Sequence, residues 1–226
     1  MTEKLKLCNL YTKPFVTIAD SYLVNFTYPW EALSGIKEYI INILGPSLDK
    51  EKFDNPSENV WIAKSAKVAA SACIGAPCVI DEDAEIRHCA YIRGSAIIGK
   101  SSVVGNSCEI KNSILFDCVQ VPHFNYVGDS ILGYRSHMGA GSITSNVKSD
   151  KTKVVLKSND QAIETGLKKF GAMLADYVEV GCNSVLNPGT IIGCNSNIYP
   201  LSCVRGFVPE NSIYKSGGII IRKEER

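Results

Sequence analysis

The segment from Ile62 to Ile110 reads IAKSAKVAASACIGAPCVIDEDAEIRHCAYIRGSAIIGKSSVVGNSCEI, and it carries a repeat of six residues. A branched apolar residue stands at every sixth position, and a small residue follows four positions later in each of the first eight repeats. The apolar series is Ile62, Val68, Ile74, Ile80, Ile86, Ile92, Ile98, Val104 and Ile110; the small series is Ala66, Ala72, Cys78, Ala84, Ala90, Ala96, Ser102 and Cys108. A sustained repeat indicates stacked units that bury their apolar sides against one another.

A period of six fits neither a helix, whose apolar positions recur at about 3.6 residues, nor a paired strand, whose side chains alternate. It predicts short parallel strands joined by tight corners, each hexapeptide forming one side of a prism. Three sides make a coil of 18 residues, and neighbouring coils stack at about the 4.8 Å spacing of paired strands. The branched residue fills the interior, and the small residue lets the backbone turn beside it.

The six-residue repeat, which we call the ladder, is irregular in two places. It slips by one residue through Val121, Val127, Leu132 and Met138, breaks at about residues 146–171, and resumes at Leu174, Val180, Leu186, Ile192, Ile198 and Val204. A slip or break in a stacked coil places a bulge or a loop there. We expect functional groups at these places, because binding residues concentrate on irregular segments held by a rigid scaffold.

Length and charge exclude several classes of protein. The 226 residues suffice for one domain with an appendage, and 24 Lys and Arg against 23 Asp and Glu leave no net field to favour nucleic acid or an anionic membrane. No apolar run approaches about 18 residues, and Met1-Thr2-Glu3-Lys4 does not open a secretory signal. We therefore expect a cytoplasmic protein with no nucleic-acid or membrane partner.

The nine cysteines raise the question of disulfides and of metal. None forms a CxxC pair, and several stand in or beside inward slots, so we expect reduced thiols that act as small apolar fillers. His88, His123 and His137 do not supply the close HxxxxH pair of the prism-shaped zinc enzymes, so no structural metal is expected.

Residues 1–55 do not follow the ladder. Tyr28-Pro29-Trp30-Glu31 is typical of a helix start, and apolar residues then recur at helical spacing until Gly45-Pro46. We expect a short helical cap over the open end of the prism, because an uncovered coil end exposes apolar rungs. The predicted organisation is therefore a helical cap or linker at 1–55, the coil at 56–214 with an excursion at about 146–172, and a tail at 215–226.

Two cations and one histidine stand out within the coil. Arg93 follows Ile92 and Lys111 follows Ile110, so the two cations are one full coil apart on the same outward edge. Two unpaired cations this close repel each other, so they either splay into solvent or hold a dianion such as a sugar phosphate. His123 stands at the phase slip, where Pro122 fixes its backbone. Its imidazole is either structural or the general base for an amine nucleophile.

The stretch from Met138 to Asn146 contains Gly139 and Gly141, which allow a ligand close to the backbone. The excursion that follows is strongly basic. It is either a solvated hairpin or a mobile cationic arm beside the phosphates of coenzyme A. Its lysines are Lys148, Lys151, Lys153, Lys157, Lys168 and Lys169.

These motifs resemble the acyltransferase domain of the glucosamine-1-phosphate acetyltransferase / N-acetylglucosamine-1-phosphate uridylyltransferase family, and its archaeal-type sugar-1-phosphate relatives in particular. The resembling segments cover roughly residues 60–210. They are IRG (92–94), VGNSCEIKN (104–112), HFNYVGD (123–129), GAGSITSN (139–146), TGLKKFGA (165–172) and NPGTIIG (187–193).

The resemblance implies an all-β fold, a left-handed parallel β-helix, and a role for each matching residue. Arg93 and Lys111 match the residues that hold the sugar phosphate, and His123 matches the catalytic base. Tyr126 and Asn146 match substrate contacts, and Ala140 matches a backbone contact of coenzyme A. Three positions depart from the bacterial pattern: His137 stands in place of a substrate-contacting asparagine, Cys182 in place of a serine near the thioester, and Gly217 near a cofactor-binding arginine.

The resemblance implies an N-acetyltransferase that uses acetyl-CoA as cosubstrate on a hexosamine 1-phosphate, with the cofactor contacted by Ala140, Cys182, Lys168 and Lys169. It also implies a homotrimer with small-molecule substrates. The doubly wound nucleotide-binding domain of the family's longer members has no counterpart in residues 1–55, so we interpret the chain as the acyltransferase half, with a separate nucleotidyltransferase chain as a possible partner. The alternatives are a sugar-1-phosphate nucleotidyltransferase and a non-catalytic sugar-phosphate-binding subunit.

Overall fold

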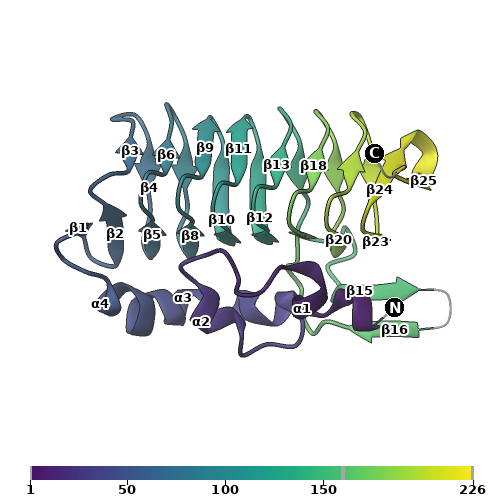
Figure 1. Ribbon diagram of the computed structural model, residues 1–226, viewed down its shortest axis with the longest axis horizontal. Coiled ribbons are helices and arrows are strands. Elements are labelled where there is room, and N and C mark those ends of the chain that lie inside the picture. The colour runs from purple at the N-terminus through teal and green to yellow at the C-terminus, as the bar shows by residue number, and fades with distance from the viewer. Residues whose placement is uncertain (1, 159–160, 225–226) are drawn as a thin grey trace.

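A left-handed parallel β-helix forms the body of the protein, as predicted (Figure 1). The computed structural model describes residues 2–158 and 161–224. The inward residues align as the repeat requires: Ile62 lies beside Ile80, and Ile80 beside Ile98, each one full coil further along the chain. The branched apolar residues of the six-residue repeat therefore fill the interior of the coil.

Each coil contributes strands to three faces, which we name by their most prominent feature. The histidine face contains β3 (Lys67–Val68), β6 (Glu85–Ile86), β9 (Val103–Asn106), β11 (Gln120–His123), β13 (His137–Met138), β18 (Glu179–Val180), β21 (Asn197–Ile198) and β24 (Ser212–Lys215). The cation face contains β4 (Cys73–Ile74), β7 (Tyr91–Ile92), the first halves of β10 (Glu109–Leu115) and β12 (Tyr126–Leu132), β14 (Ile143–Thr144), β19 (Val185–Leu186) and β22 (Cys203–Val204). The covered face contains β2 (Val60–Ala63), β5 (Cys78–Ile80), β8 (Ala96–Ile98), the second halves of β10 and β12, β17 (Ala172–Leu174), β20 (Thr190–Ile192) and β23 (Phe207–Val208).

At the predicted phase slip, one corner of the coil is one residue shorter than the same corner in the preceding coil. Ile92 pairs with Ile110, a full coil further on, whereas Ile98 pairs with Leu115, which falls one position short of a full coil. Strand β10 consequently runs straight from the cation face to the covered face, and β12 does the same one coil later. Asn112 and Asp129 stand at this shortened corner with φ of 46° and 50°.

The predicted break is an insertion at this same corner in the next coil. Thr144 pairs with Leu186, more than two coil lengths further along the chain, so the chain leaves the coil after β14 and returns at β17. The excursion contains an antiparallel hairpin of β15 (Val155–Ser158) and β16 (Gln161–Glu164). It is not a free arm, because Val154 and Leu156 are buried against the coil.

Short helices make up the N-terminal segment: η1 (Thr2–Leu5), α1 (Leu7–Leu10), α2 (Asp20–Leu23), η2 (Pro29–Ser34), α3 (Ile36–Tyr39), the π-helical η3 (Ile40–Leu44) and α4 (Gly45–Ser47). The predicted start is confirmed, since the Glu31 carboxylate accepts the backbone N–H of Tyr28 at 2.8 Å. The helix passes through Gly45-Pro46 for one more turn, because Pro is tolerated near the first position of α4.

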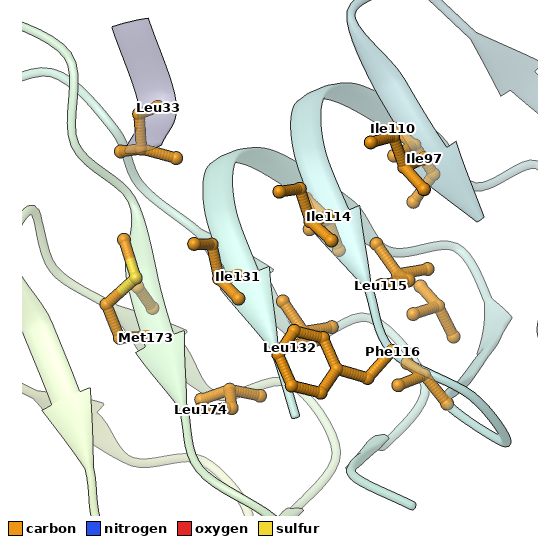
Figure 2. Close-up of a cluster of buried hydrophobic side chains, with 14 of the residues drawn as sticks. Leu33, Ile97, Ile110, Ile114, Leu115, Phe116, Ile131, Leu132, Met173 and Leu174 are labelled. Atoms are coloured by element: carbon orange, nitrogen blue, oxygen red, sulfur yellow. The ribbon is translucent and has the colours of Figure 1, made fainter. Parts of the chain in front are cut away.

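The N-terminal segment covers a face of the prism and not its open end (Figure 1). Gly45 lies against the Trp61 ring in the first coil, and the Leu10 carbonyl accepts a hydrogen bond from Cys194 near the other end. Outward side chains of the covered face are fully buried by this segment, and Figure 2 shows Leu33 on their side of the strands. They are Val79, Ile97, Ile114, Ile131, Met173 and Ile191. Exposing this row of apolar side chains to water would cost free energy. The N-terminal segment therefore packs on this face, where it buries the most apolar surface.

Both ends of the coil carry an antiparallel strand. Strand β1 (Phe53–Ser57) pairs with β2, and β25 (Ile219–Arg222) pairs with β24 after the short η4 (Ser216–Gly218). The inward residue Val68 stays 36% exposed, because the described helices lie along a face of the prism and not over its open end. The predicted tail is therefore partly a strand, and its residues 225–226 lie outside the described residues.

The cysteines divide between interior and surface. Cys78 and Cys108 fill inward slots as predicted, and burial raises the pKa of the Cys78 thiol to about 12. Five others are exposed, so the expectation of buried fillers holds only for part of the set, although all nine are free thiols. The described residues contain no group of three metal-ligating side chains. Across residues 2–158 and 161–224, no helix has the length and apolar character to span a membrane.

Substitution of two isoleucines in the N-terminal segment tests how much the packing of this segment contributes to the free energy of unfolding. Ile36 is fully buried against the coil and Ile43 is 61% exposed. We expect Ile36→Ala to lower the free energy of unfolding by about 2–5 kcal/mol, through lost burial and the cavity left behind. Ile43→Ala should change it by less than about 0.5 kcal/mol. Urea unfolding of both variants measures the difference, and equal effects would contradict the covering role.

Candidate functional site

Arg93 and Lys111 occupy consecutive positions of one column on the cation face. The Arg93 backbone N–H donates to the Ile110 carbonyl at 2.8 Å, which fixes Arg93 and Lys111 one coil apart, as the sequence predicted. Gly128 is the next position, because it pairs with Lys111 across β10 and β12. The column then continues through Ser145, Asn187 and Arg205.

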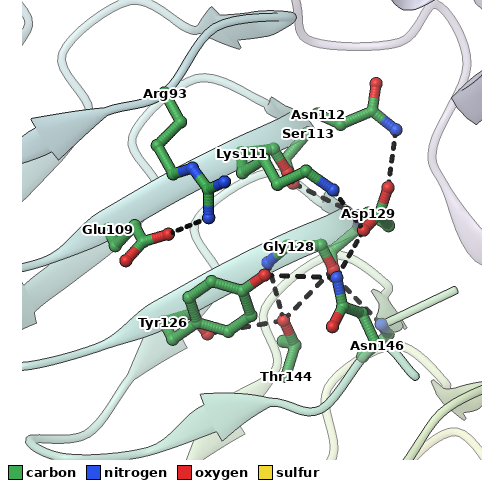
Figure 3. A network of polar contacts seen from close by, with 12 residues as sticks. Arg93, Glu109, Lys111, Asn112, Ser113, Tyr126, Gly128, Asp129, Thr144 and Asn146 are labelled. Carbon is green, nitrogen blue, oxygen red and sulfur yellow. Dashed lines mark hydrogen bonds and ion pairs between the residues drawn. The ribbon is translucent and has the colours of Figure 1, made fainter. Parts of the chain in front are cut away.

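The two cations are not unpaired, and this corrects the premise of the sequence argument. Arg93 donates to Glu109 at 2.8 Å, and Lys111 donates to Asp129 at 3.0 Å (Figure 3). Glu109 raises the pKa of the Arg93 guanidinium through this hydrogen bond. The Lys111 pair is the more enclosed, with side chains 21% and 5% exposed, whereas those of Arg93 and Glu109 are 44% and 34% exposed.

Asp129 links the candidate binding residues to one another. Its Oδ1 accepts the Asn112 amide at 2.8 Å, while its Oδ2 accepts both Lys111 and the Asn146 amide. The Asn146 amide also donates to the Tyr126 hydroxyl at 3.1 Å. Since Asp129 stands at the shortened corner, the loss of one residue from the coil is what aims its carboxylate into this network.

Tyr126 lies flat along the cation face because Gly128 has no side chain. A Cβ on Gly128 would lie 2.4 Å from the Tyr126 hydroxyl oxygen. Partial burial, with the Asp129 carboxylate nearby, raises the pKa of the Tyr126 phenol. The hydroxyl therefore stays protonated and can donate to an anionic ligand while it accepts from Asn146.

His123 stands at the corner between the histidine face and the cation face, with its side chain exposed. Its backbone is held from inside, because its N–H donates to the buried Asn125 side chain at 3.0 Å. Asn125 in turn donates to the carbonyls of Gly139 and Ser142 in the next coil, at 2.8 and 3.0 Å. An exposed imidazole on a fixed backbone is a suitable general base.

His137 is not brought to the cation column within one chain. It lies on the outward row of the histidine face, where its Nδ1 is 2.8 Å from a carboxylate oxygen of Glu179. The corner that carries His123 separates it from Tyr126 and Asn146. The candidate residues therefore surround a ridge and do not line one hollow.

The candidate cofactor residues are also divided. Ala140 and Cys182 follow His123 in successive coils on the same corner, as the registers of β11, β13 and β18 require. Lys168 and Lys169 lie at the base of the excursion, where Lys169 bridges to Val147, on the far corner of the cation face. The structure thus keeps the two lysines away from Ala140 and Cys182.

Sequence reasoning missed two residues of this site, Asp129 and Asn125. Asp129 follows Gly128 directly at the slip of the ladder, so the slip itself marked its position. Asn125 stands in the inward slot that Cys108 and Ser142 occupy in the neighbouring coils, and a polar amide in such a slot must find several partners. In the sequence, Asp129 stands where the six-residue period shifts, and Asn125 interrupts a series of small inward residues.

Comparison with protein families gives a match over part of the coil and the beginning of the excursion. The family described as "GMPPB C-terminal domain" matches residues 76–159. A protein from Methanococcus maripaludis named "Bifunctional protein GlmU" is 34% identical over 116 residues, which are 50% of this chain and 28% of that protein. A "Bifunctional sugar-1-phosphate nucleotidylyltransferase/acetyltransferase" from Sulfurisphaera tokodaii is 31% identical over 105 residues, 46% of this chain and 26% of that protein. The chain spans about a quarter of the length of these relatives.

Solved structures resemble the chain more distantly. "Crystal Structure of the polySia specific acetyltransferase NeuO" has 17% identity and a TM-score of 0.49, covering 72% of this chain and 77% of that one. A mutant of AntD, "an N-acyltransferase from Bacillus cereus", has 18% identity and a TM-score of 0.38, covering 75% and 83%. The Sulfurisphaera tokodaii relative is a sugar-1-phosphate nucleotidylyltransferase/acetyltransferase by name, and the similarity of both relatives is to about half of this chain.

The two ion pairs of the site should differ in strength. In a double-mutant cycle of Lys111→Met and Asp129→Asn, we expect a coupling of roughly 1–3 kcal/mol in the free energy of unfolding, because this pair is partly buried and hydrogen-bonded. The matched cycle of Arg93→Gln and Glu109→Gln should give less than about 1 kcal/mol, since that pair is exposed. Urea unfolding measures both, and a stronger Arg93 coupling would contradict the geometry described here.

Proposed function

We propose that this protein transfers the acetyl group of acetyl-CoA to the amine of a hexosamine 1-phosphate. The observation that carries the proposal is the network of Arg93, Lys111, Asp129, Asn146 and Tyr126 beside the exposed His123. The names of the relatives support it, because they include a sugar-1-phosphate acetyltransferase. The family match over residues 76–159 includes all of these residues.

The sugar phosphate binds at Arg93, Lys111 and the Tyr126 hydroxyl. Because both cations are already paired, the incoming phosphate has to replace a carboxylate at one of them. Glu109 is the easier to displace, since its pair with Arg93 is exposed to solvent. Lys111 stays against Asp129 and supplies a fixed donor. Arg93 thus moves to the ligand, and Lys111 holds the ligand in position.

His123 accepts a proton from the sugar amine as nitrogen attacks the thioester carbonyl. A C–N bond forms, the C–S bond of the tetrahedral intermediate breaks, and the coenzyme A thiolate leaves and takes up a proton. No covalent enzyme intermediate is required. A positioned base contributes roughly 100- to 10,000-fold to such a step.

The developing oxyanion needs a free backbone donor, and the Gly139–Gly141 turn leaves one. The Gly139 N–H donates to Val180 and the Gly141 N–H donates to His123, at 2.7 and 3.0 Å. The Ala140 N–H between them has no acceptor among the described residues. Ala140 lies one coil from His123 on the same corner, at about 4.8 Å spacing, so we assign the oxyanion to its N–H.

Replacement of each histidine by alanine tests the assignment of the base. His123→Ala should lower kcat by roughly 100- to 10,000-fold with little change in KM, measured by thiol release from acetyl-CoA with amino-sugar 1-phosphates. His88→Ala is the matched control and should retain full activity, because its imidazole is hydrogen-bonded to Ser71, which is not a candidate site residue. His137→Ala should raise KM more than it lowers kcat. A folded His123→Ala protein with near wild-type turnover would refute the assignment. Wild-type protein that binds the sugar phosphate without releasing thiol would favour a non-catalytic binding subunit.

We also propose that the protein is a homotrimer. The candidate residues surround a ridge, so a second surface is needed to enclose them. The ridge carries exposed apolar side chains, with Phe124 62% and Leu201 78% exposed. Parallel packing of three prisms would cover this ridge with a neighbouring chain and form the cofactor cleft there.

Light scattering at micromolar concentration tests the trimer directly, and we expect three times the chain mass. A Phe124→Glu, Leu201→Glu double variant should dissociate into monomers and lose thiol release, because two charges would then be buried in the interface. The control Val24→Glu changes a side chain that is 52% exposed on the N-terminal segment and should remain trimeric. Monomeric wild-type protein would refute the proposal.

A further inference from the structure

The basic excursion forms the wall of a cleft that contains none of the candidate sugar-phosphate residues. Its first strand is docked on the coil, because Val154 and Leu156 pack onto Gly189, where a Cβ would lie 2.7 and 3.0 Å from their side chains. The Gly189 N–H donates to the carbonyls of Phe170 and Gly171, which closes the base of the excursion. The excursion therefore holds a fixed position beside the C-terminal coils (Figure 1).

Between this wall and the coil lies a cleft of about 800 Å³. This volume is within the roughly 300–1,000 Å³ of small-molecule sites. Its cations come from two parts of the chain: Lys148, Lys153 and Lys157 from the excursion and Arg205 from the coil. Glu164 is the one carboxylate in the described lining. The cleft is thus strongly positive in a chain whose formal net charge is only +1.

Among the residues that the structure describes, most of these cations have no carboxylate partner. Lys148 pairs with Asp150 at 3.2 Å, but within residues 2–158 and 161–224 neither Lys153, Lys157 nor Arg205 has a carboxylate within ion-pair distance. Arg205 makes one long hydrogen bond, at 3.4 Å to Asn187. This differs from the Arg93 and Lys111 column, where each cation has its own carboxylate. Clustered cations without partners repel one another, and a polyanion relieves that repulsion.

The rest of the lining fits a phosphorylated ring system. Val155 and Pro188 are partly exposed and supply apolar surface, while Gly206 presents bare backbone. A Cβ on Gly206 would meet nothing within 4 Å, so the backbone there is open to a ligand. Small-molecule sites commonly combine apolar walls with a few polar groups that fix the orientation of the ligand.

The cleft is separate from the candidate sugar-phosphate site. Arg205 and Lys111 belong to the same column, four positions apart, through Gly128, Ser145 and Asn187. At about 4.8 Å per coil the separation is roughly 19 Å, more than a single sugar phosphate can span. We propose that the cleft is a second anion site that binds a diphosphate of nucleotide size, with the phosphates on Lys153, Lys157 and Arg205 and the ring against Val155 and Pro188.

Two sources could supply this chemistry: a free nucleoside diphosphate, or the phosphorylated adenosine end of coenzyme A. Titration calorimetry of the full chain with ADP, with adenosine 3′,5′-bisphosphate and with coenzyme A distinguishes them. We expect at least one of these probes to bind, and raised salt to weaken its binding. Preference for ADP indicates the free nucleotide, and preference for coenzyme A or the bisphosphate indicates the coenzyme.

A charge-removal variant locates the binding. Lys153→Ala, Lys157→Ala, Arg205→Ala should weaken the bound probe by at least about 10-fold, since each change removes a charge-assisted contact. The matched control Lys151→Asn removes a charge from the same excursion outside the cleft, with a residue type that tolerates the φ of 59° at this position. It should bind within about 2-fold of wild type, as for a surface position.

Gly189→Val provides a test that leaves the charges in place. The new side chain would push Val154 and Leu156 off the coil and distort the cleft, so it should weaken the same probe while circular dichroism still reports a folded coil. Binding is measured without turnover, so the outcome does not depend on acetyl transfer. The proposal is wrong if no probe binds at millimolar concentration, or if the triple variant binds as the control does.

Discussion

Register between neighbouring coils is the constraint on which the rest of this structure depends. Each inward residue lies beside its equivalent one coil later, and the backbone ladder fixes that alignment along the whole prism. A side chain at a given outward position is therefore stacked on the outward side chains of the coils before and after it. The columns of candidate site residues arise from this rule: Arg93 lies beside Lys111 on one face, and His123, Ala140 and Cys182 lie on one corner.

Much of this could be predicted from the sequence. The six-residue period predicted the coil, and the position of the slip predicted where irregular geometry would occur. Periodicity could not predict the partners of the outward side chains, because Glu109 and Asp129 look like ordinary surface carboxylates in the sequence. The stacking of Arg93 on Lys111 was therefore correct, while the view of them as unpaired was not.

The course of the N-terminal segment was also missed, although its signal was present. Apolar doublets recur once per coil, as in Ile97-Ile98, Ile114-Leu115 and Ile131-Leu132. The second residue of each doublet faces inward, so the first must face outward and needs cover. When only the inward residue of each doublet is considered, the row of outward apolar residues is overlooked. The helices are then expected at the end of the prism. Side-chain networks such as that of Asp129 depend on three-dimensional placement, and a pattern of residue types does not contain it.

The covering segment also changes how the chain must fold. In a solenoid each repeat contacts only its neighbours, so such arrays can begin to fold anywhere and fray from either end. Here the contact between Leu10 and Cys194 spans 184 residues, and the segment touches coils along most of the prism. Its apolar residues are synthesised before the coils, yet their docking surface is complete only when the chain has been made as far as Cys194. The N-terminal helices thus stay without their partner surface through most of translation, and their late docking joins separate coils into one cooperative unit.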